Sequence, residues 1–524
     1  MYAPPSVLFV QKRFLIFLAC LSLGGVILGS IAISRYGAGV AADSVKYLSV
    51  AQSLLDGNGL VDHRGIPLVL WPPLYSIVIA VVSFITRLDV LVAASYFNVL
   101  LNGINLFLAG LIFWRAFSAR PVYAYLASVF TVLNISSLRV HATIFSEPFY
   151  LTMTLGSFLA LDEYIRLRSR RSYYWILLLC ALAPMQRFVG LAIAVTVIIV
   201  FLMENRKALR TFFVESVIVG LVTSVPVGWW LFIRNLRLYG TLWGGAADQV
   251  VDVGENTSLA LTKIFHWFIP YLTPLMPILL HPFWLLAGII LILALLNFKR
   301  SDLLRNWIAA LTNQSTYPSL AYAIVYLAAV MVTSITADHQ WLYSDRYHVI
   351  VIAPVLLLTF FTFDNLVLPH LKFLLPRRDL IVVVAFALWC IYPLYGLREY
   401  LALALERGEP SEYNLYNTRD YHEMNVVAEI QKLMNEHPDA ISYSNYVDAA
   451  WFYTRKPSHP LPTRGIPNFE EAYKDWPGNN PGYLVWFKPN EYKHYLSPQE
   501  LLQFVNLQLI YSDDSGDIYY LTPH

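Results

Sequence analysis

Charged residues and cysteines are scarce in this sequence, and their scarcity excludes several classes of protein. Only 14% of the 524 residues are charged and 57% are hydrophobic, whereas soluble proteins have about 25% charged residues. Neither a soluble globule nor a disordered chain fits this composition. The formal net charge of +2 gives no support for nucleic-acid binding. Cys20, Cys180 and Cys390 each lie in an apolar run, which argues against a disulfide framework or a thiolate metal site.

Charge is unevenly distributed along the chain. From Leu397 to the C-terminus there are 10 Lys and Arg against 18 Asp and Glu, and this part has no long apolar run. The remaining residues hold 27 basic and 17 acidic side chains. The sequence therefore predicts a membrane domain over residues 1–396 and a soluble domain over residues 397–524.

Long apolar runs recur throughout the membrane domain. A spanning helix needs about 20 mostly apolar residues, and we expect about 11–13 spans of this kind. The first run, Phe14–Ile33, follows Lys12 and Arg13 and has the length of an uncleaved span with a cytoplasmic N-terminus. The other long runs are Leu91–Trp114, Val122–Ser137, Phe149–Tyr164, Tyr173–Pro184, Val189–Met203, Phe212–Phe232, Pro282–Phe298, Ser319–Thr336, Val349–Phe363 and Leu380–Leu394. The fold class expected is a polytopic α-helical membrane protein.

Basic clusters fall between alternate apolar runs, for example at Arg166–Arg171 and Arg206–Arg210. The positive-inside rule places all such clusters in the cytoplasm under one threading. The acidic C-terminal domain then lies outside a cell membrane that the chain crosses many times. Leu74–Thr86 is apolar but short, and this threading favours a non-spanning or re-entrant segment there.

The first outer loop carries the most distinctive polar residues. Asp43 immediately precedes Ser44–Leu55, whose apolar spacing predicts an amphipathic interfacial helix, and Asp56–Gly59 ends it. Trp71 then opens a Trp-Pro-Pro-Leu-Tyr string. Asp43 has the position of a helix N-cap, and capping alone is one explanation for it.

Four further strings lie at the ends of apolar runs on the predicted outer side. They are Phe145-Ser-Glu-Pro-Phe149, Gln186-Arg187, Ile233-Arg-Asn-Leu-Arg-Leu-Tyr-Gly240 and Asp345-Arg-Tyr347. Arginine is suited to bidentate capture of phosphate, although interfacial arginines also extend to lipid head groups without further function. In content and order, the Asp43 loop and these strings resemble the GT-C family of membrane glycosyltransferases. The branch that they resemble contains protein mannosyltransferases and aminoarabinose transferases.

The resemblance implies an activity and a set of site residues. Such enzymes transfer a sugar from a polyprenyl-phosphate donor at the extracytoplasmic face, with inversion, to a lipid, glycan or protein acceptor. It implies Asp43 and Glu147 as catalytic residues, with Asp43 as the base or the group that orients the acceptor. It implies phosphate binding by Arg234, Arg346, Arg187 and Arg139. Other substrate contacts would come from Lys46, Tyr47, Trp71, Asn235, Tyr239 and Tyr347.

The same resemblance leaves a divalent cation open. Asp43 and Glu147 would hold Mg²⁺ or Mn²⁺, because hard cations prefer carboxylate oxygens. In relatives the second acid is often Asp rather than Glu, and some relatives need no metal. Besides the donor and acceptor, the expected partners are membrane lipids.

The C-terminal domain reads as short α/β elements. Tyr421–Glu436 and Pro498–Leu507 are predicted helices, and Ala440–Tyr443, Tyr483–Phe487 and Asp517–Leu521 are predicted strands. The domain has no nucleophile elbow, metal-ligand spacing or phosphate loop. We expect a small accessory domain of the kind that follows the helical bundle in many GT-C enzymes.

Two other functions are compatible with a polytopic chain that carries outer arginines. A lipid or lipid-linked-sugar transporter or flippase would place charges in broken helices at mid-membrane depth, whereas here they cluster at helix ends. An enzyme resembling O-antigen ligases would use the same class of donor. Such an enzyme would carry its long outer loop within the bundle rather than at the C-terminus.

Overall fold

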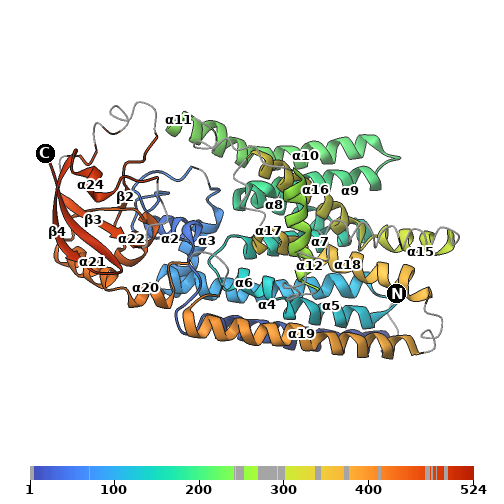
Figure 1. Ribbon diagram of the computed structural model, residues 1–524. Coiled ribbons are helices and arrows are strands. Elements are labelled where there is room, and N and C mark those ends of the chain that lie inside the picture. Colours follow the sequence, from blue (N-terminus) through green and yellow to red (C-terminus); the bar gives the residue numbers. More distant parts are fainter. Residues whose placement is uncertain are drawn as a thin grey trace. The chain divides into compact units, whose positions relative to one another are not determined.

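The computed structural model is mostly helical (Figure 1). It describes residues 5–69, 71–240, 242, 253–268, 292, 301–336, 344–370, 377–410, 415–465, 473, 476–478, 481–488 and 494–524. The predicted span Pro282–Phe298 lies outside the described residues, apart from residue 292.

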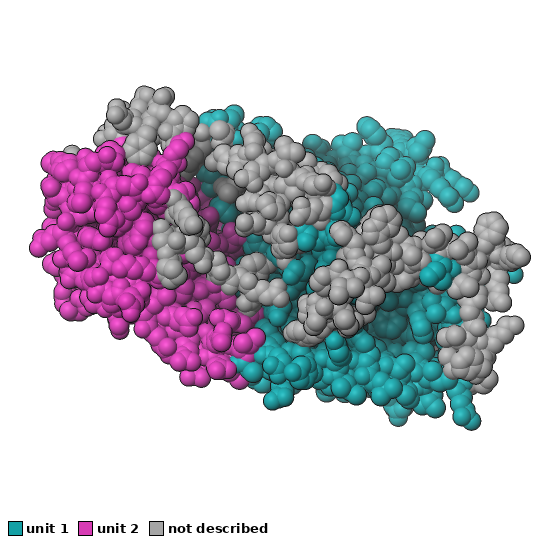
Figure 2. All heavy atoms as spheres, viewed as in Figure 1, with its two compact units in different colours: residues 1–32, 69–75, 96–402 teal, residues 33–68, 76–95, 403–524 magenta. Residues whose placement is uncertain are grey.

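The chain divides into two compact units (Figure 2). The helical unit contains Met1–Ala32, Val69–Tyr75 and Tyr96–Ala402, and the sheet unit contains Ile33–Leu68, Ser76–Ser95 and Leu403–His524. Residues 33–68 of the first outer loop therefore belong to the same unit as the C-terminal residues, whereas Trp71 belongs to the helical unit. The division of the sequence into domains 1–396 and 397–524 stays a prediction.

Helices form most of the helical unit. They are α1 (Pro5–Ala32), α4 (Val90–Ala116), α5 (Pro121–Leu133), α6 (Ile135–His141), α7 (Glu147–Leu167), α8 (Arg170–Gln186), η1 (Phe188–Gly190), α9 (Leu191–Glu204), α10 (Leu209–Gly228), η2 (Trp229–Asn235), α11 (Leu236–Tyr239), α12 (Val253–His266), α15 (Ser301–Leu311), α16 (Tyr317–Thr336), α17 (Asp345–His348), η4 (Val349–Val351), α18 (Ile352–Thr362), η5 (Phe363–Val367), η6 (Leu368–His370) and α19 (Arg378–Arg407). The first six residues of α4 and the last five of α19 fall in the sheet unit.

Several helices have the length and composition of membrane spans. Within the described residues there are five, Gln11–Ala32, Val90–Ala116, Leu209–Leu238, Asp345–Val367 and Arg378–Arg407. A sixth results if α5 and α6, which are bent by 54° at their junction, form one broken span. The structure thus supports a multi-pass membrane protein, as the composition predicts. The short apolar helix α3 (Leu74–Thr86) has the predicted bounds.

The sheet unit contains a five-stranded mixed sheet in the order β2-β1-β3-β5-β4. Its elements are α2 (Ala42–Leu55), α3, α20 (Arg419–Glu423), α21 (Asn425–Glu436), β1 (Ile441–Ser444), α22 (Val447–Thr454), β2 (Ser458–Pro460), β3 (Gly482–Phe487), α24 (Pro498–Leu501), β4 (Val505–Ser512) and β5 (Gly516–Pro523). Strands β2, β1 and β3 are parallel, and β5 pairs antiparallel with both β3 and β4.

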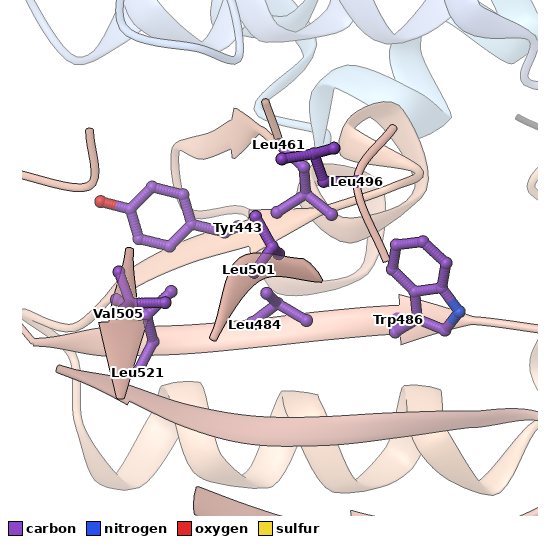
Figure 3. Packing of buried hydrophobic residues seen from close by; sticks show 8 residues of the cluster. All are labelled: Tyr443, Leu461, Leu484, Trp486, Leu496, Leu501, Val505 and Leu521. Atoms are coloured by element: carbon purple, nitrogen blue, oxygen red, sulfur yellow. The ribbon is translucent and has the colours of Figure 1, made fainter. Parts of the chain in front are cut away.

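The core of the sheet unit lies against β3, which is buried along its whole length. Leu484 and Trp486 of β3 pack with Leu501 and Leu521 in a cluster of buried side chains (Figure 3). A strand covered on both faces reads as a continuous apolar run rather than an alternating one, and Tyr-Leu-Val-Trp-Phe over 483–487 has this character.

The predicted elements of this unit are present with two corrections. The helix predicted over Tyr421–Glu436 is divided at Met424 into α20 and α21. The strands expected at Ala440–Tyr443, Tyr483–Phe487 and Asp517–Leu521 correspond to β1, β3 and β5. The helix predicted over Pro498–Leu507 is wrong beyond Leu501, because Val505 begins strand β4. Pairing of β4 with β5 outweighs the local helical pattern, since strand formation depends on the neighbours available.

Backbone hydrogen bonds join the first outer loop to the C-terminal residues within the sheet unit. The N–H of Tyr416 donates to the carbonyl oxygen of Val40 at 2.8 Å, and that of Ser458 to the carbonyl oxygen of His63 at 3.1 Å. The side-chain amide of Asn417 donates to the carbonyl oxygen of Ala38 at 3.1 Å. These bonds hold both ends of the segment that carries α2.

The predicted helix after Asp43 is present, but Asp43 is not its N-cap. Helix α2 begins at Ala42, so Ala41 is the N-cap and Asp43 lies in the first turn. The N–H of Ala41 donates to the Ser44 hydroxyl at 3.0 Å. The side chain of Ser44 therefore does the capping, and capping does not account for a carboxylate at residue 43.

Candidate functional site

Glu147 lies at the start of α7, where the sequence places the second acid. Its side chain is 1% exposed, and the helix N-terminus favours a negative charge there. Pro148 occupies one of the first helical positions, where it needs no N–H partner. The Ser-Glu-Pro string thus encodes both the start of the helix and the burial of a carboxylate at its tip.

Arg187 binds this carboxylate from the junction between α8 and η1. Its Nη1 lies 2.7 Å from Oε1 of Glu147 and donates to the hydroxyl of Ser146 at 2.8 Å. The preceding residue, Gln186, donates from its amide to the carbonyl oxygen of Ser146 at 2.8 Å. The Gln-Arg pair singled out in the sequence therefore attaches to the Ser-Glu pair through three contacts.

Close packing fixes the backbone that carries Arg187. A Cβ atom on Gly190 would lie 2.3 Å from the carbonyl carbon and oxygen of Ala183. Only glycine allows η1 to approach the end of α8 so closely. Gly190 in turn donates its N–H to the carbonyl oxygen of Arg187 at 2.7 Å.

Helix α17 supplies a second guanidinium group to the same carboxylate. Nε of Arg346 lies 3.4 Å from Oε1 of Glu147, and Nη2 donates to the hydroxyl of Tyr347 at 2.6 Å. The guanidinium carbon of Arg346 is 5.0 Å from the ring centre of Phe145, and that of Arg187 is 5.5 Å from the ring of Tyr347. Aromatic faces and one shared carboxylate hold the two arginines together.

The first residue of α17 extends the charged group. Asp345 lies 3.7 Å from Nη1 of Arg139, on α6, and 3.9 Å from Nζ of Lys263, on α12. We call Arg139, Glu147, Arg187, Lys263, Asp345 and Arg346 the arginine cluster. It contains four cationic and two anionic side chains, and its arginines are only 13–20% exposed. Because poorly solvated charges interact strongly, an anion is the ligand that this cluster suits.

Arg234 and Asn235 form a separate group in the helical unit. The guanidinium carbon of Arg234 lies 4.1 Å from the Trp230 ring centre, and its Nη1 donates to the Asn235 side-chain oxygen at 3.2 Å. Asn235 is buried and donates to the carbonyl oxygens of Val69 and Leu242 at 3.1 Å. It thereby anchors the segment that contains Trp71. The side chain of Tyr239 lies outside the described residues.

Asp43, Lys46 and Tyr47 lie on α2, in the sheet unit. Near them is a pair in which Nε2 of His63, which is buried, lies 3.1 Å from Oδ1 of the partly buried Asp448. Burial lowers the pKa of His63 to about 3 and raises that of Asp448 to about 6. Lys46 lowers the pKa of Asp448 and Asp43 raises it, so the charges of α2 lie within electrostatic reach of this pair.

Solved structures share this architecture. ArnT from Cupriavidus metallidurans in the apo state superposes with a TM-score of 0.59, at 13% identity over 98% of both chains. ArnT bound to undecaprenyl phosphate gives a TM-score of 0.58, at 14% identity over 97% of this chain and 98% of that one. The chain has the GT-C fold.

A more distant structure with the GT-C fold is the oligosaccharyltransferase of Archaeoglobus fulgidus in complex with zinc and sulfate. It superposes with a TM-score of 0.52, at 12% identity over 97% of this chain and 72% of that one. No protein-family model and no curated protein sequence matches this chain. The comparisons therefore establish the fold.

The described residues do not form a metal site around Glu147. Its Oε1 faces Arg187 and Arg346, and its Oε2 lies 3.5 Å from the Ser146 hydroxyl. Among the described residues there is no group of three or more His, Cys, Asp or Glu side chains arranged to hold a metal ion. A cation held by Asp43 and Glu147 stays a prediction of the resemblance.

Two residues of the arginine cluster were absent from the residues expected at the site. Asp345 directly precedes Arg346 in the Asp-Arg-Tyr string, so its adjacency to a predicted ligand was the available signal. Lys263 lies on α12 without a distinctive neighbourhood in the sequence. Only the packing of α12 against α17 brings it to Asp345.

Proposed function

We propose that the chain is an integral membrane glycosyltransferase that uses a polyprenyl-phosphate-linked sugar. It transfers the sugar at the extracytoplasmic face, with inversion, to a lipid, glycan or protein acceptor. The observation that carries the proposal is the arginine cluster, in which Arg187 and Arg346 share the buried carboxylate of Glu147 within a GT-C fold. The undecaprenyl phosphate bound by ArnT supports the same class of donor.

The reaction needs positive charge where the phosphate leaves. As the acceptor oxygen bonds to the anomeric carbon, the bond from that carbon to the phosphate oxygen breaks, and polyprenyl phosphate departs with the bonding electrons. Arg187 and Arg346 stabilise the charge that develops on this phosphate. Glu147 orients their guanidinium groups before the donor arrives, which reduces the reorganisation needed during the reaction.

The reaction also needs a base for the acceptor hydroxyl. Asp43 takes this proton as the new glycosidic bond forms, and Lys46 and Tyr47 on the same helix contact the acceptor or the sugar. Arg234, Asn235, Tyr239 and Trp71 contribute further donor contacts, and Arg139 supports the phosphate from α6. A flippase or transporter is the alternative, and the ArnT-like architecture favours the transferase.

Release of polyprenyl phosphate from a radiolabelled lipid donor tests the proposal. Purified protein is incubated with the donor and a membrane extract that supplies acceptors, and the label leaving the donor is timed. Arg346→Ala should slow this transfer by roughly 10- to 100-fold, because charge-assisted hydrogen bonds contribute about 1.5–3 kcal/mol each. Arg237→Ala, at an exposed arginine on α11, serves as the control. Equal turnover in the wild type and in Arg346→Ala would refute the phosphate role.

A further inference from the structure

A cationic cavity, separate from the arginine cluster, lies at another set of helix ends in the helical unit. It has a volume of about 660 Å³ and lies where α7 ends and where α8 and α10 begin. Helix α8 packs against both α7 and α10 (Figure 1). The residues that line the cavity are Tyr164, Arg168, Ser169, Arg170, Tyr173, Tyr174, Arg210, Thr211, Val214 and Glu215. None of these residues belongs to the arginine cluster or to the group around Arg234.

The charges of this cavity are only partly balanced. Nη2 of Arg168 lies 3.1 Å from Oε2 of Glu204, and Glu215 accepts hydrogen bonds from the Tyr164 hydroxyl at 2.5 Å and from the Asn205 amide at 2.8 Å. Within the described part of the chain, neither Arg170 nor Arg210 has an ion-pair partner. Two exposed guanidinium groups therefore border a cavity whose one carboxylate is already hydrogen-bonded.

The remaining lining has the character of a membrane interface. Tyr174 is 65% exposed and Val214 is 48% exposed. Each lies one turn after a cationic residue of the cavity, Tyr174 on α8 and Val214 on α10, where the apolar part of the helix begins. Tyrosine is enriched where the hydrocarbon meets the head groups. The positive-inside rule assigns the basic residues of this region to the cytoplasmic side. They lie in the clusters Arg166–Arg171 and Arg206–Arg210.

We propose that this cavity binds the phosphate of an anionic phospholipid from the cytoplasmic leaflet. Arg170 and Arg210 pair with the phosphate, and the hydroxyls of Ser169 and Thr211 donate to its oxygens. The acyl chains lie along the exposed apolar surface near Tyr174 and Val214. Basic pockets between spanning helices on this side of a membrane suit anionic head groups, and attraction to the leaflet adds to the affinity. The site is separate from the sugar donor site and does not depend on the proposed transferase activity.

Native mass spectrometry of the full chain tests this inference. Protein released from nanodiscs is titrated with phosphatidylglycerol or phosphatidylcholine, and bound lipid is counted. The double variant Arg170→Gln/Arg210→Gln should bind phosphatidylglycerol roughly tenfold more weakly than the wild type. The matched control is Arg171→Gln/Lys207→Gln, which removes two exposed charges from the same helix ends but not from the cavity lining. It should bind phosphatidylglycerol as the wild type does.

Three outcomes would overturn the inference. Equal loss in both double variants would mean that surface charge, not the cavity, attracts the lipid. Equal retention of phosphatidylcholine by the wild type would remove the anionic preference. Displacement of phosphatidylglycerol by equimolar inorganic phosphate would identify a site for free phosphate instead of a lipid. All four changed side chains are exposed, and unchanged melting temperatures would confirm that the variants are folded.

Discussion

At the scale of single residues, the site depends on how Glu147 is neutralised. A carboxylate that is 1% exposed is stable only when it is paired, and Arg187 and Arg346 pair with it. Removing one guanidinium leaves the other in place, whereas removing the carboxylate leaves two partly buried cations close together. The three side chains therefore act as a unit, and single substitutions among them are not expected to be additive.

Asp43 is the residue whose replacement distinguishes chemistry from structure. Asp43→Asn preserves the shape of the side chain and removes its basicity, and loss of a general base typically slows a reaction by about 10²–10⁴-fold. Because Ala41 is the N-cap of α2, Asn at residue 43 leaves the cap intact and removes a first-turn charge, worth about 0.3–1 kcal/mol. We expect a large loss of sugar transfer in a protein with nearly unchanged stability.

The control for this substitution lies at the other end of the same helix. Asp56 accepts a hydrogen bond from the Gln52 amide at 2.8 Å, and Asp56→Asn should leave turnover unchanged. Near-normal transfer by Asp43→Asn would remove Asp43 from the mechanism. Adding a chelator and then Mg²⁺ or Mn²⁺ to the same assay tests the predicted cation. A transfer rate that neither the chelator nor the added metal changes would mean that Asp43 acts without a metal.

At the scale of elements, the contact between η1 and α8 positions the arginine cluster. Gly190→Ala would place a methyl group against the backbone of Ala183, which has no freedom to move aside. We expect η1 to shift and carry Arg187 away from Glu147. Displacements of about 1 Å at a reacting site cost about 10²-fold in rate, and overpacking costs about 1–3 kcal/mol of stability.

Gly220 is the matched control for Gly190. It lies inside α10, and a Cβ atom there would meet nothing within 4 Å. Gly220→Ala should leave turnover unchanged and stabilise the helix by about 0.5–1 kcal/mol. Melting curves and sugar-transfer rates of the two variants provide the comparison. Equal rates for Gly190→Ala and Gly220→Ala would show that η1 does not position Arg187.

Acid sensitivity of the sheet unit is expected at α24. Hydrogen bonds from Arg464 and from Ser497 lower the pKa of Glu500 to about 2. Because this pKa is lowered, the ionised Glu500 stabilises the folded state at pH values above its ordinary pKa of 4.5. This contribution is lost as the pH falls toward 2. The protection factors of the amide hydrogens of residues 499–501 in the full chain should therefore fall over this range. Glu500→Gln should have low protection factors at every pH, and a wild-type pH dependence of the protection factors in this variant would contradict the assignment.

The sequence predicted elements better than it predicted contacts between them. Helix α2 and strands β1, β3 and β5 follow from local sequence patterns, and β4 does not, because its pairing with β5 is non-local. Glu147, Arg187 and Arg346 were each expected at the site through short strings at helix ends. Their convergence on one carboxylate depends on how α7, α8 and α17 pack, which no local pattern encodes. The pair of His63 and Asp448 was not expected for the same reason.

At the scale of the whole molecule, the proposed sugar transfer at the extracytoplasmic face depends on the membrane topology of the chain. A reporter fused after His524 should report the extracytoplasmic side, and one inserted at Ser169 should report the cytoplasm. The alternating basic clusters and the acidic C-terminal residues underlie this expectation. Paired alkaline phosphatase and fluorescent-protein fusions at both positions make the measurement. A cytoplasmic C-terminus would place the proposed transfer on the wrong side of the membrane.

The most direct test of the central claim is a cryo-electron microscopy structure with a bound polyprenyl-phosphate sugar. The account predicts that the phosphate of the donor lies within about 3 Å of guanidinium nitrogens of Arg187 or Arg346. A donor phosphate bound elsewhere, with Glu147 still paired with both Arg187 and Arg346, would contradict this proposal.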